Sequence, residues 1–237
     1  MSLLKVQPSQ MNNAAIVVPW RTAEGREKSF ELAQKYNAET FSDFKFYFSD
    51  SVGEKFNVSE ARNRGCIQAI EDGYNLLVVL DADTVFERDA VVDALKVVTE
   101  SGGVCYPYTL SIETNQQLSE RIDSGELNLE DLSWHMDATE MHVGSGWVMS
   151  SETFWEMNGW DENFKGWGWE DAAFQLAYET KFDRIMSRSE GTCYRFWHPV
   201  RDTYSFGENL YRYESEYTEE NISQLLLSNM VHRSNLD

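Results

Sequence analysis

Two aspartates, Asp81 and Asp83, follow the most hydrophobic run of the chain in the segment NLLVVLDADTVF (75–86). Aspartate is common in turns and ends strands by hydrogen-bonding its own backbone, so a plain surface turn is one interpretation. A metal site is the other, because Mg²⁺ and Mn²⁺ prefer oxygen ligands and often take only one or two protein carboxylates, leaving room for water and substrate phosphates. The position directly after an apparent buried strand favours the metal site.

A second acidic pair, Glu170 and Asp171, lies in GWGWED (166–171), where a helical pattern begins. Acids in the first turn of a helix are favoured by the helix dipole, which is a purely structural explanation. One of the four histidines, His198, lies downstream in RFWHP. A lone histidine of this kind is more often structural than functional, so these residue types alone leave both interpretations open.

Apolar runs that look like strands alternate with amphipathic segments that look like helices. Strands are predicted at 14–20, 44–50 and 75–83, helices at 25–36, 59–73 and 87–102, and a further strand at 143–150. This order predicts an α/β fold with a mostly parallel central sheet flanked by helices on both faces.

Polar residues follow three of the predicted strands. Pro19 to Arg21 follow the first, Asp50 follows the second, and the two aspartates follow the third. Ligands bind beyond the carboxyl ends of the strands in sheets of this class. We therefore expect these residues to meet in one crevice.

Length and composition are consistent with a single domain, because 237 residues with 42% hydrophobic content can form one substantial core. The formal net charge of -20 opposes binding to nucleic acids and anionic membranes. A phosphate-bearing ligand would need a metal ion or a few arginines. Cys66, Cys105 and Cys193 are odd in number and far apart, which predicts free buried thiols in a reducing compartment. No apolar run is long enough for a membrane span, and a cytoplasmic protein is expected.

Several segments together resemble a known family. Asp81-Ala82-Asp83 matches the Asp-x-Asp motif of the GT-A glycosyltransferases, and the chain is most similar to the β1,4-galactosyltransferase family. The other matching segments are VVPWR (17–21), FNVSEARNRG (56–65), Asn-Gly (158–159) and GWGWED (166–171). The resemblance covers residues 14–200 and implies a single GT-A domain there, preceded by an N-terminal extension (1–13). The C-terminal extension (201–237) is predicted to be helical, with Ile222, Leu225, Leu226 and Met230 on one stripe that packs on the domain or meets a partner.

The resemblance implies a UDP-sugar donor and a divalent metal, Mn²⁺ or Mg²⁺. Asp83 would be the principal metal ligand, supported by Asp81, and His198 would complete the site. An imidazole beside carboxylates fits Mn²⁺ better than Mg²⁺. ARNRG (61–65) also resembles a segment of bacterial family-two glycosyltransferases. The residues expected at the nucleotide are Pro19, Arg21, Asp50, Phe56 and Arg62.

In the resembling family the position of Asp171 acts as the general base. An acceptor hydroxyl must lose its proton as it attacks the anomeric carbon, and one base with in-line displacement implies inversion. Glu170 would instead bond sugar hydroxyls, although the sequence does not order the two acids. Trp160, Trp167 and Trp169 could stack on sugar rings or anchor a loop, and contact with donor or acceptor is expected above all for Trp167. Trp169 departs from the family, which has a small residue there, and a bulky ring would reshape the sugar pocket.

The sequence therefore predicts a metal-dependent, inverting, UDP-sugar-dependent glycosyltransferase acting on an unknown glycan or other hydroxyl acceptor. The alternative is a catalytically silent GT-A-like protein that binds nucleotide or glycan. A nucleotidyltransferase is a third hypothesis, but PWRTAEGREK has too few glycines for its phosphate loop. His135 and His142 receive no role.

Overall fold

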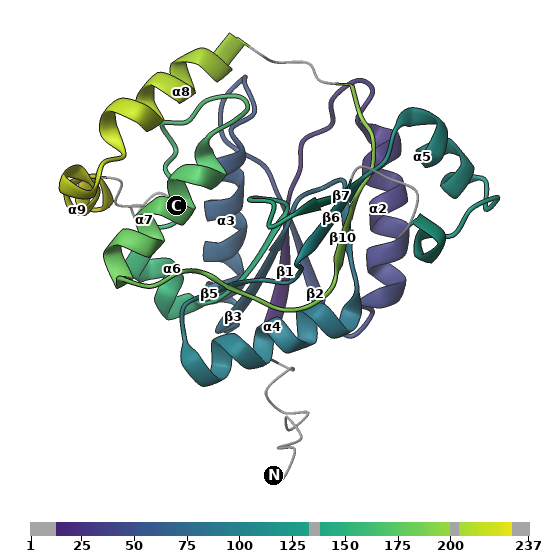
Figure 1. The fold of residues 1–237 in the computed structure, drawn as a ribbon, viewed down its shortest axis with the longest axis horizontal. Coiled ribbons are helices and arrows are strands. Elements are labelled where there is room, and N and C mark those ends of the chain that lie inside the picture. Colours follow the sequence, from purple (N-terminus) through teal and green to yellow (C-terminus); the bar gives the residue numbers. More distant parts are fainter. Residues whose placement is uncertain (1–12, 133–137, 200–203, 229–237) are drawn as a thin grey trace.

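The computed structural model describes residues 13–132, 138–199 and 204–228. Its centre is a six-stranded mixed sheet in the order β2-β1-β3-β8-β5-β9 (Figure 1). The strands are β1 (Ala14–Pro19), β2 (Lys45–Ser49), β3 (Leu76–Leu80), β5 (Val104–Tyr106), β8 (Gly146–Ser150) and β9 (Ser187–Arg188). The predicted α/β fold with a largely parallel sheet is confirmed.

β1 lies between β2 and β3 and pairs with both in parallel, so that Ile16 is opposite Phe46 on one side and Val78 on the other. β8 is antiparallel to β3 and to β5, while β9 runs parallel to β5. The parallel part consists of continuous apolar strands that are buried along their length in β1 and β3, as expected for strands covered on both faces.

Four short strands form a second sheet that the sequence did not predict, in the order β4-β10-β6-β7. They are β4 (Thr84–Phe86), β6 (Leu110–Glu113), β7 (Ala138–Glu140) and β10 (Thr192–Arg195). β10 is antiparallel to β4 and parallel to β6. In this sheet, the strand that directly follows Asp83 (β4) pairs with the strand that precedes His198 (β10).

The helices lie around the central sheet, with α2 on one side and α3 on the other (Figure 1). The first half contains α2 (Glu27–Thr40), α3 (Val58–Glu71), α4 (Arg88–Ser101) and α5 (Gln116–Asp123), followed by a 3₁₀ turn at Leu129–Leu132. The second half contains α6 (Ser151–Met157), α7 (Glu170–Phe182), α8 (Tyr204–Glu216) and α9 (Glu219–Ser228). Among the described residues, no helix is both long and apolar enough to cross a membrane.

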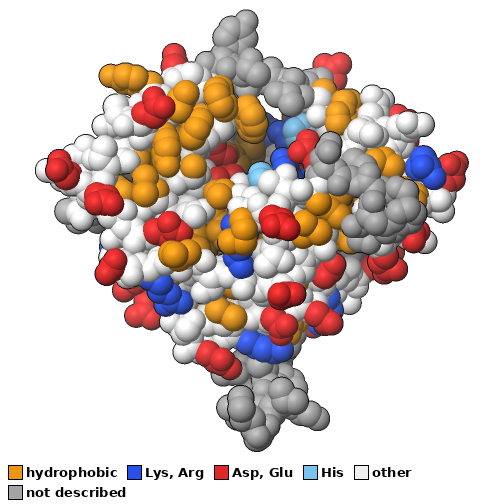
Figure 2. All heavy atoms as spheres, in the orientation of Figure 1, with side chains coloured by type: hydrophobic (Ala, Val, Ile, Leu, Met, Phe, Trp, Pro, Cys, Tyr) orange, Lys and Arg blue, Asp and Glu red, His pale blue; other side chains and the backbone are white. Residues whose placement is uncertain are grey.

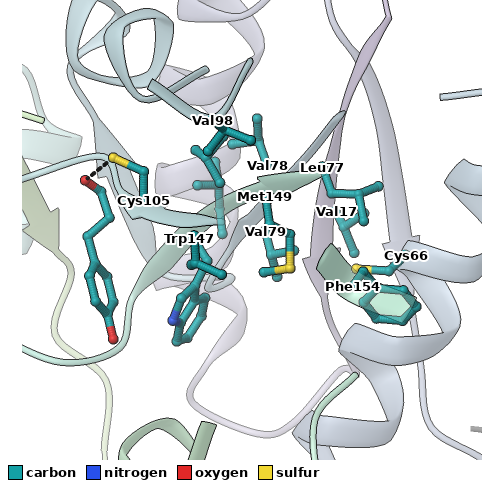
Figure 3. Packing of buried hydrophobic residues seen from close by; sticks show 14 of the residues in the cluster. Val17, Cys66, Leu77, Val78, Val79, Val98, Cys105, Trp147, Met149 and Phe154 are labelled. Atoms are coloured by element: carbon teal, nitrogen blue, oxygen red, sulfur yellow. Dashed lines mark hydrogen bonds between the residues drawn. The ribbon is translucent and has the colours of Figure 1, made fainter. Parts of the chain in front are cut away.

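The core is formed where β1, β3 and β8 meet the flanking helices, and Figure 3 shows Val17, Leu77, Val79 and Met149 in this packing. Ile222 and Leu226 of α9 are buried in the same cluster, so the C-terminal helices are part of the packed structure. Met230, the last residue of the stripe expected there, lies outside the described residues. The three cysteines are buried and free, as predicted.

Gly65 allows α3 to pack closely on β1 and β2. A Cβ atom at this position would lie 2.5 Å from both Ser49 Oγ and Val17 Cγ1. We expect Gly65→Ala to lower the free energy of unfolding by about 1–3 kcal/mol, because overpacking a close helix–sheet contact forces atoms apart. Urea unfolding monitored by circular dichroism measures this loss.

Gly207→Ala is the matched control, because Gly207 also lies within a helix but a Cβ there meets no atom within 4 Å. Alanine is the better helix former by about 1 kcal/mol, so this variant should be unchanged or slightly stabilised. Equal stability changes in the two variants would contradict the close packing at Gly65.

Candidate active site

The polar residues predicted at the ends of β1 and β2 lie together. Arg21 Nε donates to both carboxylate oxygens of Asp50, at 2.8 and 2.9 Å, and Arg21 Nη2 donates to the carbonyl of Ser51 at 2.6 Å. The Arg21 guanidinium lies 5.7 Å from the centre of the Phe56 ring, and Pro19 is the last residue of β1. The Asp50 side chain is half exposed, so its carboxylate can also accept a hydrogen bond from a ligand.

Asp83 and His198 face each other beyond the end of β3, with 2.8 Å between Oδ2 and Nε2. The pairing of β4 with β10 brings them together, because β4 begins directly after Asp83 and the Phe196 N–H donates to the Asp83 carbonyl. Arg26 Nη2 lies 2.9 Å from the same His198 nitrogen and 3.6 Å from Asp83 Oδ2. Burial raises the pKa of Asp83, but His198 and Arg26 outweigh it and hold the pKa below its usual value.

A carboxylate oxygen and an imidazole nitrogen that lie 2.8 Å apart could serve as two ligands of a divalent cation, in place of their present contact with each other and with Arg26. Two protein ligands with open positions are what Mg²⁺ and Mn²⁺ sites that bind phosphates commonly provide. The Asp81 carboxylate is turned to Arg62 instead. No group of three or more His, Cys, Asp or Glu side chains arranged for a metal occurs within the described ranges.

Arg62 of α3 is a buried cation that joins the two acidic motifs. Its Nη2 donates to Asp81 Oδ1 and its Nη1 to Asp171 Oδ1, each at 2.7 Å, while Glu170 Oε1 lies 3.9 Å away. The guanidinium stacks on Trp147, 4.4 Å from the ring centre. Burial lowers the pKa of Arg62, but the three carboxylates outweigh it and raise the pKa above the usual arginine value. The sequence placed Arg62 at the nucleotide and gave no sign of this bridge.

The acids at the start of α7 are held in an unfavourable setting for a negative charge. Burial raises the pKa of Asp171 well above its usual value, and the charges of Glu170 and Asp81 raise it further, against the opposing effect of Arg62. Burial likewise raises the pKa of Glu170. Glu170 is 7% exposed, whereas the Asp171 side chain keeps 23% of its surface exposed. Asp171 is therefore the more accessible of the two acids.

His142 is a neighbour of Asp171 that sequence reasoning left without a role. A Cβ atom on Gly144 would lie 2.6 Å from Asp171 Oδ2 and 3.7 Å from His142 Nε2, so both side chains surround this glycine. Burial lowers the pKa of His142 to about 4, with a further contribution from Arg195, and the ring is neutral at pH 7. The sequence around His142 is polar and has no helical or strand periodicity, so it gave no indication of this position. His135 lies outside the described residues.

The three tryptophans of the aromatic segment have different settings. Trp160 is buried and stacks on Phe174 with 4.4 Å between ring centres, so it belongs to the core. Trp167 is 53% exposed and free to meet a ligand on its open face. Trp169 stacks on Tyr213 of α8, so part of its ring contacts that helix, and its effect on a sugar pocket stays a prediction.

Figure 2 shows a hollow in the surface of the molecule. Hydrophobic side chains gather along one side of it, and acidic, basic and histidine side chains lie in and beside it. A surface of this kind, with an apolar wall next to charged groups, suits a ligand that has both sugar-like and anionic parts.

No protein-family model and no curated protein sequence matches the chain. Its fold is that of the GT-A glycosyltransferases, as comparison with solved structures shows.

The catalytic domain of Drosophila β1,4-galactosyltransferase 7 in complex with xylobiose is 18% identical, with a TM-score of 0.56 over 83% of this chain and 79% of that one. A mutant of the same enzyme with manganese, UDP-Gal and xylobiose is also 18% identical, with a TM-score of 0.51 over 74% of this chain. The chain spans 64% of the length of that second structure.

Proposed function

We propose that this protein is a metal-dependent, inverting glycosyltransferase that moves a sugar from a UDP-sugar to an acceptor hydroxyl. The observation that carries the proposal is the bridge through Arg62. It joins Asp81, which belongs to the same strand end as the Asp83–His198 pair, to Asp171 at the start of α7. A cation held at this strand end and a base at Asp171 would thus act in one site, as transfer from a diphosphate donor needs.

Asp83 and His198 would hold Mn²⁺, and Asp81 would support them with Oδ2, since Arg62 donates to its Oδ1. The metal would offset the charge of the diphosphate as it leaves the sugar, in a protein whose net charge of -20 otherwise opposes a phosphate ligand. The similar structure that contains manganese and UDP-Gal supports this proposal. Arg26, which contacts both ligand residues, would add positive charge beside the phosphates.

The nucleotide would lie over Pro19, Arg21, Asp50 and Phe56. A uracil ring can stack on Phe56 beside the Arg21 guanidinium, and the exposed carboxylate of Asp50 can accept the N–H of the ring or a ribose hydroxyl. The bifurcated hydrogen bond from Arg21 Nε to both oxygens fixes the orientation of Asp50. Arg62, expected at the nucleotide, would act on the donor through Asp81, which it holds.

Asp171 would take the proton of the acceptor hydroxyl. Its raised pKa makes it a stronger base than an ordinary aspartate, and it is the more accessible acid. Glu170 would bond sugar hydroxyls, and the open face of Trp167 would stack on a sugar ring. Attack by an acceptor activated on one side of the donor, with the diphosphate leaving on the other, inverts the anomeric carbon. The donor sugar and the acceptor are not assigned.

Calorimetric titration of UDP into the purified protein, with Mn²⁺ and again with EDTA, tests the donor site. We expect binding with Mn²⁺ and none with EDTA, and Asp83→Asn should abolish the metal-dependent binding. Screening UDP-sugars for hydrolysis and transfer follows. Absence of UDP binding under both conditions would contradict the proposal.

A further inference from the structure

α8 contacts the loop that leads into α7, and a single side chain of α8 holds that loop by its backbone. Asn209 is 4% exposed. Its Nδ2 lies within hydrogen-bonding distance of the carbonyl oxygens of Lys165 at 2.8 Å, Gly168 at 3.0 Å and Trp167 at 3.3 Å. Its Oδ1 accepts from the Lys165 N–H at 3.3 Å. One buried amide thus contacts carbonyl groups of Lys165, Trp167 and Gly168, which share its two N–H donors.

Aromatic rings of α8 pack against the same turn. The Phe206 ring lies 5.4 Å from the Trp167 ring and 5.7 Å from the Trp169 ring, centre to centre, and Tyr213 stacks on Trp169 at 5.1 Å. Phe206 fits only because Gly168 has no side chain, since a Cβ there would lie 2.9 Å from the phenyl ring. The inner side of Trp167 is therefore supported by α8 while its outer side stays exposed.

α8 is itself fixed to the beginning of this loop. Arg212 Nη2 donates to Asp161 Oδ2 at 2.7 Å, and the Tyr217 hydroxyl donates to the same oxygen at 2.8 Å. Burial raises the pKa of Asp161, but these hydrogen bonds and that from Asn163 hold it below its usual value. The helix is thus tied to the loop at Asp161 and again at Lys165 to Gly168, and it cannot shift without moving both.

The loop ends at α7. Trp169 is the N-cap residue of α7, with a φ of +75° and no side-chain hydrogen bond to cap the helix. Glu170 and Asp171 follow directly, so the backbone that places their carboxylates is the backbone that α8 holds. Because the N-cap side chain gives no cap, the backbone that enters α7 depends on its contacts with α8 as well as on the bond between Arg62 and Asp171.

We propose that Asn209 is a positioning residue, which orients Trp167 and the first turn of α7 by clamping residues 165–168. Its effect on transfer rests on the function proposed above, whereas the clamp on the loop does not. Loss of the clamp should slow the chemical step and weaken the acceptor, because both depend on these residues. In the part of the chain that the structure describes, Asn209 forms no hydrogen bond with the proposed nucleotide residues. UDP binding should therefore be spared, even though Gly166 pairs with Asn57 beside one of them.

Asn209→Asp is the sharpest test, because the new side chain has nearly the same shape but offers oxygens to three carbonyl groups and cannot donate to them. Glu208→Ala, a change at the preceding, exposed residue of α8, is the control. Hydrogen exchange of the peptide that covers 162–171 is measured together with kcat, acceptor KM and UDP affinity in Mn²⁺. Asn209→Ala provides a second variant if the aspartate form does not fold.

We expect loop amides to exchange at least about tenfold faster in the Asn209 variants, as a local opening easier by about 1.4 kcal/mol would produce. We also expect kcat to fall and acceptor KM to rise, each several-fold, with the UDP affinity within twofold of wild type and the control unchanged.

Unchanged loop exchange would overturn the clamp, and faster exchange with unchanged kcat and KM would overturn the positioning role. A wild-type protein that neither binds UDP nor transfers sugar would contradict the proposed function instead, while the exchange experiment would still decide the clamp.

Discussion

Replacing Arg62 with alanine should lower the free energy of unfolding by about 3–5 kcal/mol, because the change leaves buried acids without their cation. Arg62 is 1% exposed and lies against Asp81, Asp171 and Glu170. Removing the guanidinium also removes its stacking on Trp147 and opens a cavity. Denaturant unfolding at pH 7 measures the loss, which should become smaller at lower pH as the carboxylates take up protons.

Arg64→Ala is the matched control for this measurement. Arg64 lies on the same helix two residues further along and is partly exposed, and a surface substitution of this kind usually changes stability by about 0.5 kcal/mol or less. A loss below about 1 kcal/mol for Arg62→Ala would mean that the three acids are neutral or rearranged in the folded protein, and that the bridge is not a major stabilising contact.

Asp171→Asn should leave Mn²⁺-dependent UDP binding intact and reduce transfer by about 10²–10⁴-fold, because general-base catalysis typically contributes that much. The amide keeps the shape of the side chain but cannot accept a proton. Initial rates with saturating donor and acceptor measure the effect. In the wild type, the rate should rise with pH around a midpoint above the usual aspartate value, since burial raises the pKa of Asp171 and the base must be ionised to act.

Glu170→Gln separates the two acids. If Glu170 only bonds sugar hydroxyls, this variant should mainly raise KM and retain most of kcat. Thermal unfolding of both variants is needed, because Asp171 and Glu170 both face Arg62 and each substitution alters the bridge. Full turnover in Asp171→Asn, or a larger loss of kcat in Glu170→Gln, would move the role of base away from Asp171.

The strands that the sequence predicted are those with long apolar or aromatic runs. The predicted runs at 14–20, 44–50 and 75–83 correspond to β1, β2 and β3. β1 and β3 are apolar because they are buried along their length, whereas β2, at the edge of the sheet, was recognisable by its aromatic residues. The parallel order of these strands also places Arg21 next to Asp50. The second sheet escaped prediction because its strands have only three or four residues, too few to show a period.

The candidate site likewise contains residues that the sequence predicted and residues that only the fold brings together. Asp83 and His198 were linked through a resemblance, and the pairing of β4 with β10 supplies the physical reason for their contact. Arg62 acts through tertiary contacts with residues 19 and 109 positions away in the sequence. Asn209 acts through contacts with residues 41 to 44 positions away. No local pattern reports such contacts. An arginine or asparagine within an amphipathic helix is usually a solvated residue, and only the fold shows these two to be buried.

The place of β8 in the central sheet affects how the chain can fold. β8 separates β3 from β5 and pairs with both, although it is made long after β3 and after most of the second sheet. A nascent chain that ends before Gly146 would carry open strand edges on β3 and β5, and such edges invite pairing with other chains. Because contacts between distant segments slow folding, completion of the sheet should be a late step that begins only when β8 has been synthesised.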